Sequence, residues 1–245
     1  FTTLYLIKTD EGALLFDSAS YDNDARDYII PFLTELGVGR TELKYVFISH
    51  NHKDHSGGLA SLLIEFPDVC VLSRSPALKE KFNGYKVYSP EHGEIFLGCL
   101  KAIPIPGHTH DSCALLDIRN NALYTGDCLQ FYGICGNEDW ASNVGILEEH
   151  FSSLRMLEKL DVDFIYSAHD YYPYGYKYIG KDAVKRGIEA CREPLLRLKT
   201  MIENNSELSD LEIRALYNND PSKPTISAGV VGARRAVVEK GISLE

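Results

Sequence analysis

Hydrophobic positions in the first two thirds of the chain fall in short runs that are bounded by turn residues. Leu4–Ile7 and Ala13–Phe16 flank the turn sequence Thr-Asp-Glu-Gly at 9–12, which predicts a β-hairpin. Lys44–Ile48 is apolar, β-branched and aromatic, as expected of a buried strand. Similar runs predict further strands at 69–73, 86–88, 94–97, 100–105, 114–118, 122–124 and 164–167, with turns at 91–93 and 120–121.

Other segments carry apolar residues at helical spacing. These predict helices at 25–36, where Gly37 ends the pattern, and at 59–66, 75–82 and 146–160. Beyond Gly180 the chain turns helical, and Pro194 is expected to break or kink this segment. Because the first half reads mainly as hairpins, we expect an α+β fold. Two packed β-sheets with helices outside, a four-layer αββα sandwich, fit this pattern better than a regular βαβ series.

Length and composition limit the classes of protein. The 245 residues suit a catalytic domain over 1–180 with a helical extension over 181–245 packed on it. No apolar run approaches the roughly 20 residues that span a bilayer, so no membrane partner is expected. The net charge of −10 without a basic stripe argues against nucleic-acid partners. A homodimer is compatible with the sequence.

The six cysteines and the first residue bear on localisation. The cysteines form no Cys-x-x-Cys pair and mostly lie in apolar runs, which favours a reducing, cytoplasmic setting. The chain begins with Phe1, and 3–8 already reads as the middle of a strand. We therefore expect that an upstream segment has been removed.

The segment that follows the strand 44–48 gathers chemistry-bearing side chains. His50, His52, Asp54 and His55 fall within six residues, between a buried strand and the helix at 59–66. Loops at strand ends are where α/β folds place their chemistry. His50 and His52 are two apart on an extended tip, so both rings can face one point, and Asp54 and His55 can turn toward a second. This spacing predicts a site for two metal ions, against the alternative of a surface histidine tract that binds metal incidentally.

Three later strand ends each offer one more ligand. His108 follows the strand at 100–105, Asp127 follows 122–124, and His169 follows 164–167. Gly107 and Gly126 precede two of them, where the backbone must approach closely. His169 has a capping or core role as its alternative.

With these elements the chain resembles the metallo-β-lactamase fold superfamily. The signature His-x-His-x-Asp-His stands at 50–55, and the Gly-His, Gly-Asp and terminal His elements follow in order over residues 3–170. The resemblance implies that His50, His52 and His108 bind the first metal. It implies that Asp54, His55 and His169 bind the second, with Asp127 bridging the two.

Imidazole and carboxylate ligands suit two Zn²⁺ ions, and Fe or Mn is compatible when oxygen ligands are added. Such a pair lowers the pKa of a bridging water toward neutrality. We therefore expect a hydrolase in which a metal-bridging hydroxide attacks a small substrate. Asp54 is the expected catalytic residue, because it can hydrogen-bond the nucleophile and pass its proton to the leaving group.

Substrate contacts are expected from side chains next to these ligands. His110 lies two residues after His108, and a substrate contact and a role without function are equally weighted for it. Phe131, Tyr132 and Trp140 form one candidate wall, and Tyr171 and Tyr172 form another, against ordinary packing. No functional role is expected of His92, which lies in a turn, or of His150, which borders the apolar stripe of its helix.

Residues 124–129 and 133–136 look like the thioesterase branch, the hydroxyacylglutathione hydrolases, although basic residues that hold glutathione carboxylates are not apparent. Thioester or lactone hydrolysis is therefore favoured weakly. The enzyme alternatives are a β-lactamase, a phosphodiesterase or ribonuclease, and a flavin-coupled di-iron oxidoreductase. A metal-retaining binding or regulatory module is the alternative from another class.

Overall fold

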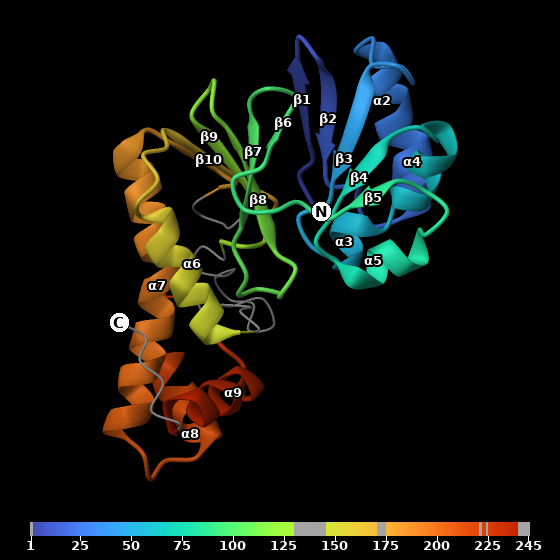
Figure 1. Cartoon of the computed structure of the whole chain (residues 1–245). Helices are drawn as coiled ribbons and strands as arrows, with labels where there is room; N and C mark the ends of the chain where they lie inside the picture. The colour runs from blue at the N-terminus through green and yellow to red at the C-terminus, as the bar shows by residue number, and fades with distance from the viewer. Residues whose placement is uncertain (1, 130–145, 171–174, 221, 224, 240–245) are drawn as a thin grey trace. The chain divides into compact units, whose positions relative to one another are not determined.

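The computed structural model describes residues 2–129, 146–170, 175–220, 222–223 and 225–239 (Figure 1). The expected contact residues Phe131, Tyr132, Trp140, Tyr171 and Tyr172 lie outside these ranges. Two compact units divide the chain: unit 1 comprises 1–104, 111–127 and 166–169, and unit 2 comprises 105–110, 128–165 and 170–245. The predicted boundary near residue 180 stays a prediction. No helix in the described ranges is both long and apolar enough to cross a bilayer.

The first sheet of unit 1 is mostly parallel. Its order is β1-β2-β3-β4-β5, with strands Tyr5–Thr9, Gly12–Phe16, Leu43–Phe47, Cys70–Leu72 and Val87–Tyr88. Only β1 and β2 form the predicted hairpin, and the other neighbours pair in parallel. The expectation that the first half is mainly hairpins is therefore wrong for this sheet. Most of β2 is buried, as in strands covered on both faces, and such strands favour parallel pairing with helical crossovers.

Helical segments cover one face of this sheet. They are α1 (Asp22–Asp24), η1 (Ala25–Ile29), α2 (Ile30–Glu35), α3 (Lys53–Ser56), α4 (Leu59–Glu65) and α5 (Pro76–Lys81). Figure 1 shows α2 and α4 on the same side of the sheet. Leu33 of α2 and Leu62 of α4 share one buried cluster with Leu15 and Val46 of the strands. The predicted helix at 25–36 is thus present, with a π-helical turn in its first half.

The second sheet has the order β11-β10-β9-β8-β7-β6. Its strands are Ile95–Phe96 (β6), Leu100–Pro104 (β7), Cys113–Asp117 (β8), Ala122–Gly126 (β9), Phe164–Ser167 (β10) and Lys177–Ile179 (β11). The predicted turn at 91–93 is present, and it connects β5 of the first sheet to β6 of the second. Strand β11 was not predicted.

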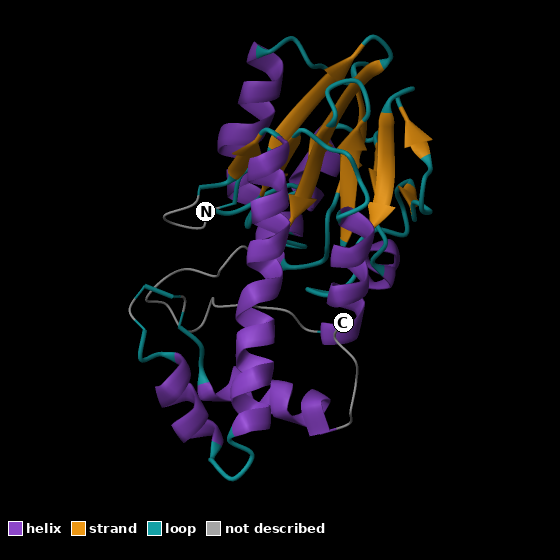
Figure 2. Ribbon diagram, turned by 90° about the vertical axis from the view of Figure 1, so that its left-hand side faces the viewer, coloured by secondary structure: helices purple, strands orange, loops and turns teal. Residues whose placement is uncertain are grey.

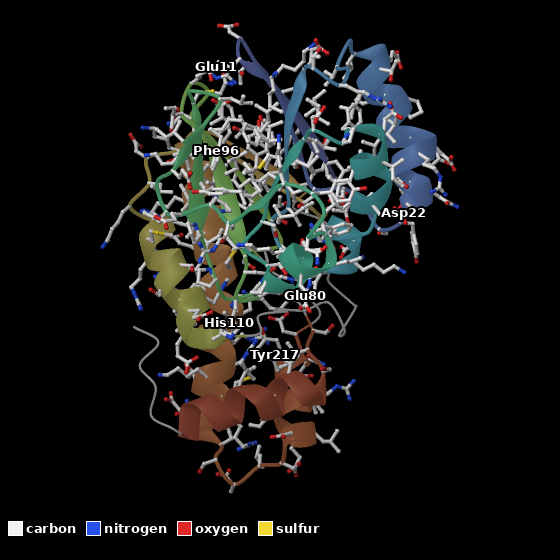
Figure 3. All side chains as sticks on the ribbon, turned by 45° about the vertical axis from the view of Figure 1, so that its right-hand side comes forward. Glu11, Asp22, Glu80, Phe96, His110 and Tyr217 are labelled. Carbon is white, nitrogen blue, oxygen red and sulfur yellow. The ribbon has the colours of Figure 1, made fainter. Side chains whose placement is uncertain are left out.

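The two sheets of unit 1 share an apolar core. Phe16 and Phe47 stack with ring centroids 5.3 Å apart, and Leu100 and Leu115 of the second sheet join the same cluster. Figure 3 labels Phe96, which lies in this cluster beside Tyr45. Residues from both sheets therefore make one continuous interior, as expected for a β-sandwich.

Unit 2 is mainly helical. It contains α6 (Leu147–Leu157), α7 (Lys181–Asn204), α8 (Asp210–Tyr217) and α9 (Ala228–Glu239), and α7 is the long helix of Figure 2. Helix α7 continues through Pro194, so of the two predicted effects the break is wrong, and the kink stays a prediction. Pro194 is buried and its carbonyl accepts a hydrogen bond from Tyr217 Oη at 3.2 Å. Tyr217, labelled in Figure 3, packs in a core formed by α7, α8 and α9, and this packing offsets the missing backbone donor.

Candidate metal centre

The loop after β3 leads directly into α3 and carries four of the predicted ligands. His50 is fully buried, whereas His52 is exposed and has extended backbone angles (φ −68°, ψ 151°) as the residue that precedes α3. Asp54 and His55 lie within that short helix. The sequence predicts the extended tip correctly but not the helical turn. Within this turn the His55 ring stays beside that of His50, with ring centroids 4.1 Å apart.

Asp54, His55, Asp127 and His169 converge on one point in unit 1. Their candidate ligand atoms all lie within 4.8 Å of one another. His169 Nε2 lies 3.2 Å from Asp54 Oδ2 and 3.1 Å from Asp127 Oδ1. His55 Nε2 lies 3.2 Å and 3.4 Å from the same two oxygens. Two imidazoles and two carboxylates from helix α3 and from the ends of β9 and β10 therefore face a common centre.

The charges of this cluster are strongly coupled. Burial raises the pKa of Asp127, but His55 and His169 outweigh it and hold the pKa well below its usual range. Burial also raises the pKa of Asp54. The hydrogen bonds from His169 and His55 lower it by more, so the net pKa of Asp54 is below its usual value. Burial lowers the pKa of His169, yet hydrogen bonds to Asp127 and Asp54 bring it up to about 9. Both carboxylates are thus held as anions, which is the form that binds a cation.

A buried carboxylate, Asp17, contacts the cluster through His55. It accepts from Ser49 N at 2.7 Å and from Ser49 Oγ at 2.9 Å, and its Oδ2 lies 2.8 Å from His55 Nδ1. Burial lowers the pKa of His55, but Asp17 and Asp127 raise it well above the usual value. A histidine whose Nδ1 is held by a carboxylate presents Nε2 in a fixed direction, as metal-binding histidines commonly do. His55 Nε2 is buried and lies near the carboxylate oxygens of Asp54 and Asp127 without hydrogen-bond geometry to any described residue.

Sequence reasoning missed Asp17. The available signal was an acid placed directly after the apolar strand Gly12–Phe16, the same strand-end position that identified Asp127. Asp17 also has a left-handed backbone (φ 65°), a conformation that Asp tolerates better than most residues.

Two strand ends of the second sheet deliver Asp127 and His169. Gly126 ends β9 with φ 55°, and a Cβ there would lie 2.6 Å from Ser49 Cβ. The carbonyl of Gly126 accepts from Ala168 N at 3.2 Å, the residue before His169. Close backbone approach at Gly126 therefore brings Asp127 and His169 toward the first loop, as the sequence anticipates for this glycine.

His50 and His52 lie in unit 1 as a second, smaller group. Their ring centroids are 4.6 Å apart, and His50 Nδ1 lies 3.1 Å from Ser49 Oγ. Ser49 therefore contacts His50 and also Asp17. One serine thus links the surroundings of the first predicted metal to those of the second.

His108 and His110 belong to unit 2, in the loop that follows β7. This loop is fastened to α6: Ile146 N donates to Gly107 O, and Ser153 Oγ donates to Pro106 O, both at 2.7 Å. His108 is 5% exposed, while the His110 side chain is 77% exposed and pairs with Glu149 at 3.0 Å. In unit 2, the recorded partner of His110 is thus a carboxylate of α6. A substrate contact by His110 stays a prediction.

The donors present fit a divalent cation. Imidazole nitrogens and carboxylate oxygens are the ligands of zinc, iron and manganese sites. Six of the seven predicted ligands lie in unit 1, and four of them converge. Two buried or half-buried carboxylates this close together need a neighbouring positive charge, since like charges oppose each other at short range.

The chain is similar to proteins of a known family. Residues 1–169 match the model of the Metallo-beta-lactamase superfamily. An Aspergillus fumigatus protein named Atrochrysone carboxyl ACP thioesterase is 31% identical over 171 residues, which cover 69% of this chain and 37% of the relative. A Caenorhabditis elegans Beta-lactamase-like protein 2 homolog is 27% identical, covering 69% of this chain and 55% of the relative. The chain thus spans about half or less of the length of these relatives.

Solved structures share the fold. A metallo-beta-lactamase family protein of Thermus thermophilus superposes with a TM-score of 0.67 and 20% identity over 98% of this chain and 89% of that one. ETHE1 of Myxococcus xanthus gives 0.52 with 26% identity over 70% of this chain and 72% of that one. These matches confirm the predicted α+β sandwich with a C-terminal helical region. The chain belongs to the metallo-beta-lactamase superfamily.

Proposed function

We propose that the protein is a metal-dependent hydrolase of a small thioester, lactone or related carbonyl compound. The observation that carries the proposal is the convergence of Asp54, His55, Asp127 and His169 on one point. In this proposal these four side chains would hold one divalent cation, and His50, His52 and His108 would hold a second, with Asp127 as the ligand common to both sites. Zinc is the favoured metal for a set so rich in imidazole.

A pair of divalent cations, when bound, supplies Lewis acidity and lowers the pKa of water. The protein's own groups do the rest. The side chains of Asp127 and His55 are 7% and 0% exposed. They therefore hold the negative charge of Asp127 at the centre of the cluster and exclude bulk water from it. Asp54, with its side chain 33% exposed, lies at the open side of the cluster. Its carboxylate is placed to orient an attacking water and to pass the proton to the leaving group.

For a thioester, the oxygen of water forms a bond to the carbonyl carbon and the carbon–sulfur bond breaks. The thiolate that leaves takes up the proton, so the products are a carboxylic acid and a thiol. The relatives named as thioesterases support this substrate class. β-Lactams and phosphodiesters remain alternatives for the same ligands, and a metal-retaining binding module is the alternative without turnover.

The test combines metal analysis with four substrates. The purified protein is assayed for bound metal by mass spectrometry and for turnover of a thioester, a lactone, a β-lactam and bis-p-nitrophenyl phosphate. The proposal expects two metals per chain and the fastest turnover for a thioester or lactone. A metal-loaded protein that is inert toward all four substrates would contradict hydrolysis and favour the binding module.

A further inference from the structure

A polar pocket lies beside the predicted metal loop within unit 1. Its volume is about 500 Å³. Segments from three parts of the sequence line it: the loop after β2, the metal loop with α3, and α5. Asn51 and Lys53, which line the pocket, alternate along the chain with the predicted ligands His50, His52 and Asp54. A molecule held in the pocket is therefore next to the metal loop.

Hydrogen-bond donors predominate in its lining. The lining residues Ser20, Tyr21, Asn51, Lys53 and Lys81 have side chains with hydroxyl, amide and ammonium donors. The hydroxyl of Ser56 is already donated to His52 O at 3.0 Å. Lys53 is restrained, because its Nζ lies 4.0 Å from the centre of the Tyr21 ring. A cation stacked on an aromatic face retains its charge and its remaining donors for another ligand.

Lys53 and Lys81 carry the positive charge of the lining. Among the described residues neither lysine takes part in an ion pair, so no acidic side chain neutralises them there. The acid recorded in the lining is Asp22, and its Oδ1 already accepts a hydrogen bond from Ser61 N at 3.0 Å. Figure 3 labels Asp22 of α1 and Glu80 of α5, which mark the two helical elements involved. The charge of the lining is therefore net positive.

We propose that this pocket binds an anionic group, a phosphate or a carboxylate, that the substrate carries away from its scissile carbonyl. The inference rests on the proposed hydrolase function and narrows its substrates to anionic ones. It also supplies basic groups that the sequence alone does not bring together, since Lys53 and Lys81 are 28 positions apart and join only through the fold.

The first test uses turnover. The variants Lys53→Gln, Lys81→Gln and the double variant are assayed with an acyl-coenzyme A, an acyl-glutathione and the neutral N-acetylcysteamine thioester of the same acid. Two exposed charge contacts predict a KM about 10-fold higher for the anionic thioesters in the double variant, with kcat unchanged. The neutral thioester should keep its KM. The coenzyme A and glutathione arms separate a phosphate ligand from a carboxylate ligand.

Lys79→Gln is the matched control, because Lys79 is exposed on the same helix α5 but is absent from the pocket lining. Equal KM values for the double variant and the control would overturn the proposal. Since Lys53 lies between two predicted ligands, metal content is measured in each variant. Lys81→Gln, on a separate helix, keeps the test decisive if Lys53→Gln loses metal.

The second test does not depend on turnover. Binding of desulfo-coenzyme A and S-methylglutathione is measured by calorimetry in the metal-loaded protein. Binding that Lys81→Gln weakens and Lys79→Gln preserves supports the pocket even if no thioester is hydrolysed, in which case only the proposed function fails. Equal binding by the wild type and both variants means that the probes do not bind through this pocket, and this result overturns the proposal.

Discussion

Two buried histidines, one in each unit, have opposite surroundings. His55 in unit 1 has Asp17 at Nδ1 and lies near Asp54 and Asp127 at Nε2, and these acids raise its pKa. His150 in unit 2 is buried with His108 and Arg234 as its charged neighbours, and burial together with these groups lowers its pKa to about 3. Both are almost completely inaccessible, so burial does not distinguish them. The carboxylates make one of them a cation site.

The comparison separates a ligand from a packing residue without reference to a motif. A histidine surrounded by carboxylates lies in a negative field that attracts a metal ion, whereas one beside a guanidinium lies in a field that repels it. His150 belongs to the second class, which agrees with its reading as a bland residue in the sequence.

Removal of the Asp127 carboxylate, which His55 and His169 share, is expected to have the largest effect. Asp127→Ala should lose bound metal and reduce turnover by about 10³-fold or more, since this side chain faces both His55 and His169. The exposed His92 is the control, and His92→Ala should leave metal content and rate unchanged. Metal analysis and kinetics measure both. Equal losses in the two variants would contradict the assignment.

Asp17→Asn sharpens the account of how His55 is held. Asn fits the left-handed backbone and preserves the shape at Ser49, but it removes the charge that orients His55. Metal affinity should fall about 10- to 100-fold, as for other partners that orient ligands. Titration of the metal-free protein with Co²⁺ measures the affinity. An unchanged affinity, matching that of the exposed-site variant Asp10→Asn, would rule out this role for Asp17.

His150 predicts a pH dependence of stability. Its pKa is about 3 in the folded protein, and the unfolded chain takes up a proton near pH 6.5, so acid favours unfolding. Between pH 6.5 and pH 3 each unit of acidification should cost about 1.4 kcal/mol at this residue. Urea unfolding of wild type and His150→Gln should therefore show stabilities that converge as the pH falls from 7 to 5. A constant difference between the two would refute a neutral buried His150.

The smallest expected effect concerns the loop that carries His108. Ser153→Ala removes the hydrogen bond to Pro106 O and should weaken metal binding at the site that includes His108 by about 2- to 10-fold. The neighbouring Ser152 is exposed on the same helix, so Ser152→Ala is a matched control. Co²⁺ absorption follows the two sites separately. Weakening of both sites to the same extent would indicate general destabilisation instead.

The sequence predicted the parts of the site that depend on local order. Strand ends followed by His or Asp identify His50, Asp127 and His169, because a side chain that closely follows a strand is carried to the sheet edge. It could not supply the pairing of distant segments. The parallel register of β2 with β3, the contact of Asp17 with His55, and the presence of Lys53 and Lys81 in one pocket lining each depend on long-range packing. The continuity of α7 through Pro194 depends likewise on Tyr217, 23 residues away.

The central claim is that a pair of cations is held by two groups of side chains. One group is Asp54, His55, Asp127 and His169, and the other is His50, His52 and His108. Metal analysis of the purified protein after dialysis against a metal-free buffer tests it most directly. The account predicts about two divalent ions per chain in the wild type. A wild-type protein that retains no metal, and binds none when zinc is returned at micromolar concentration, would contradict it.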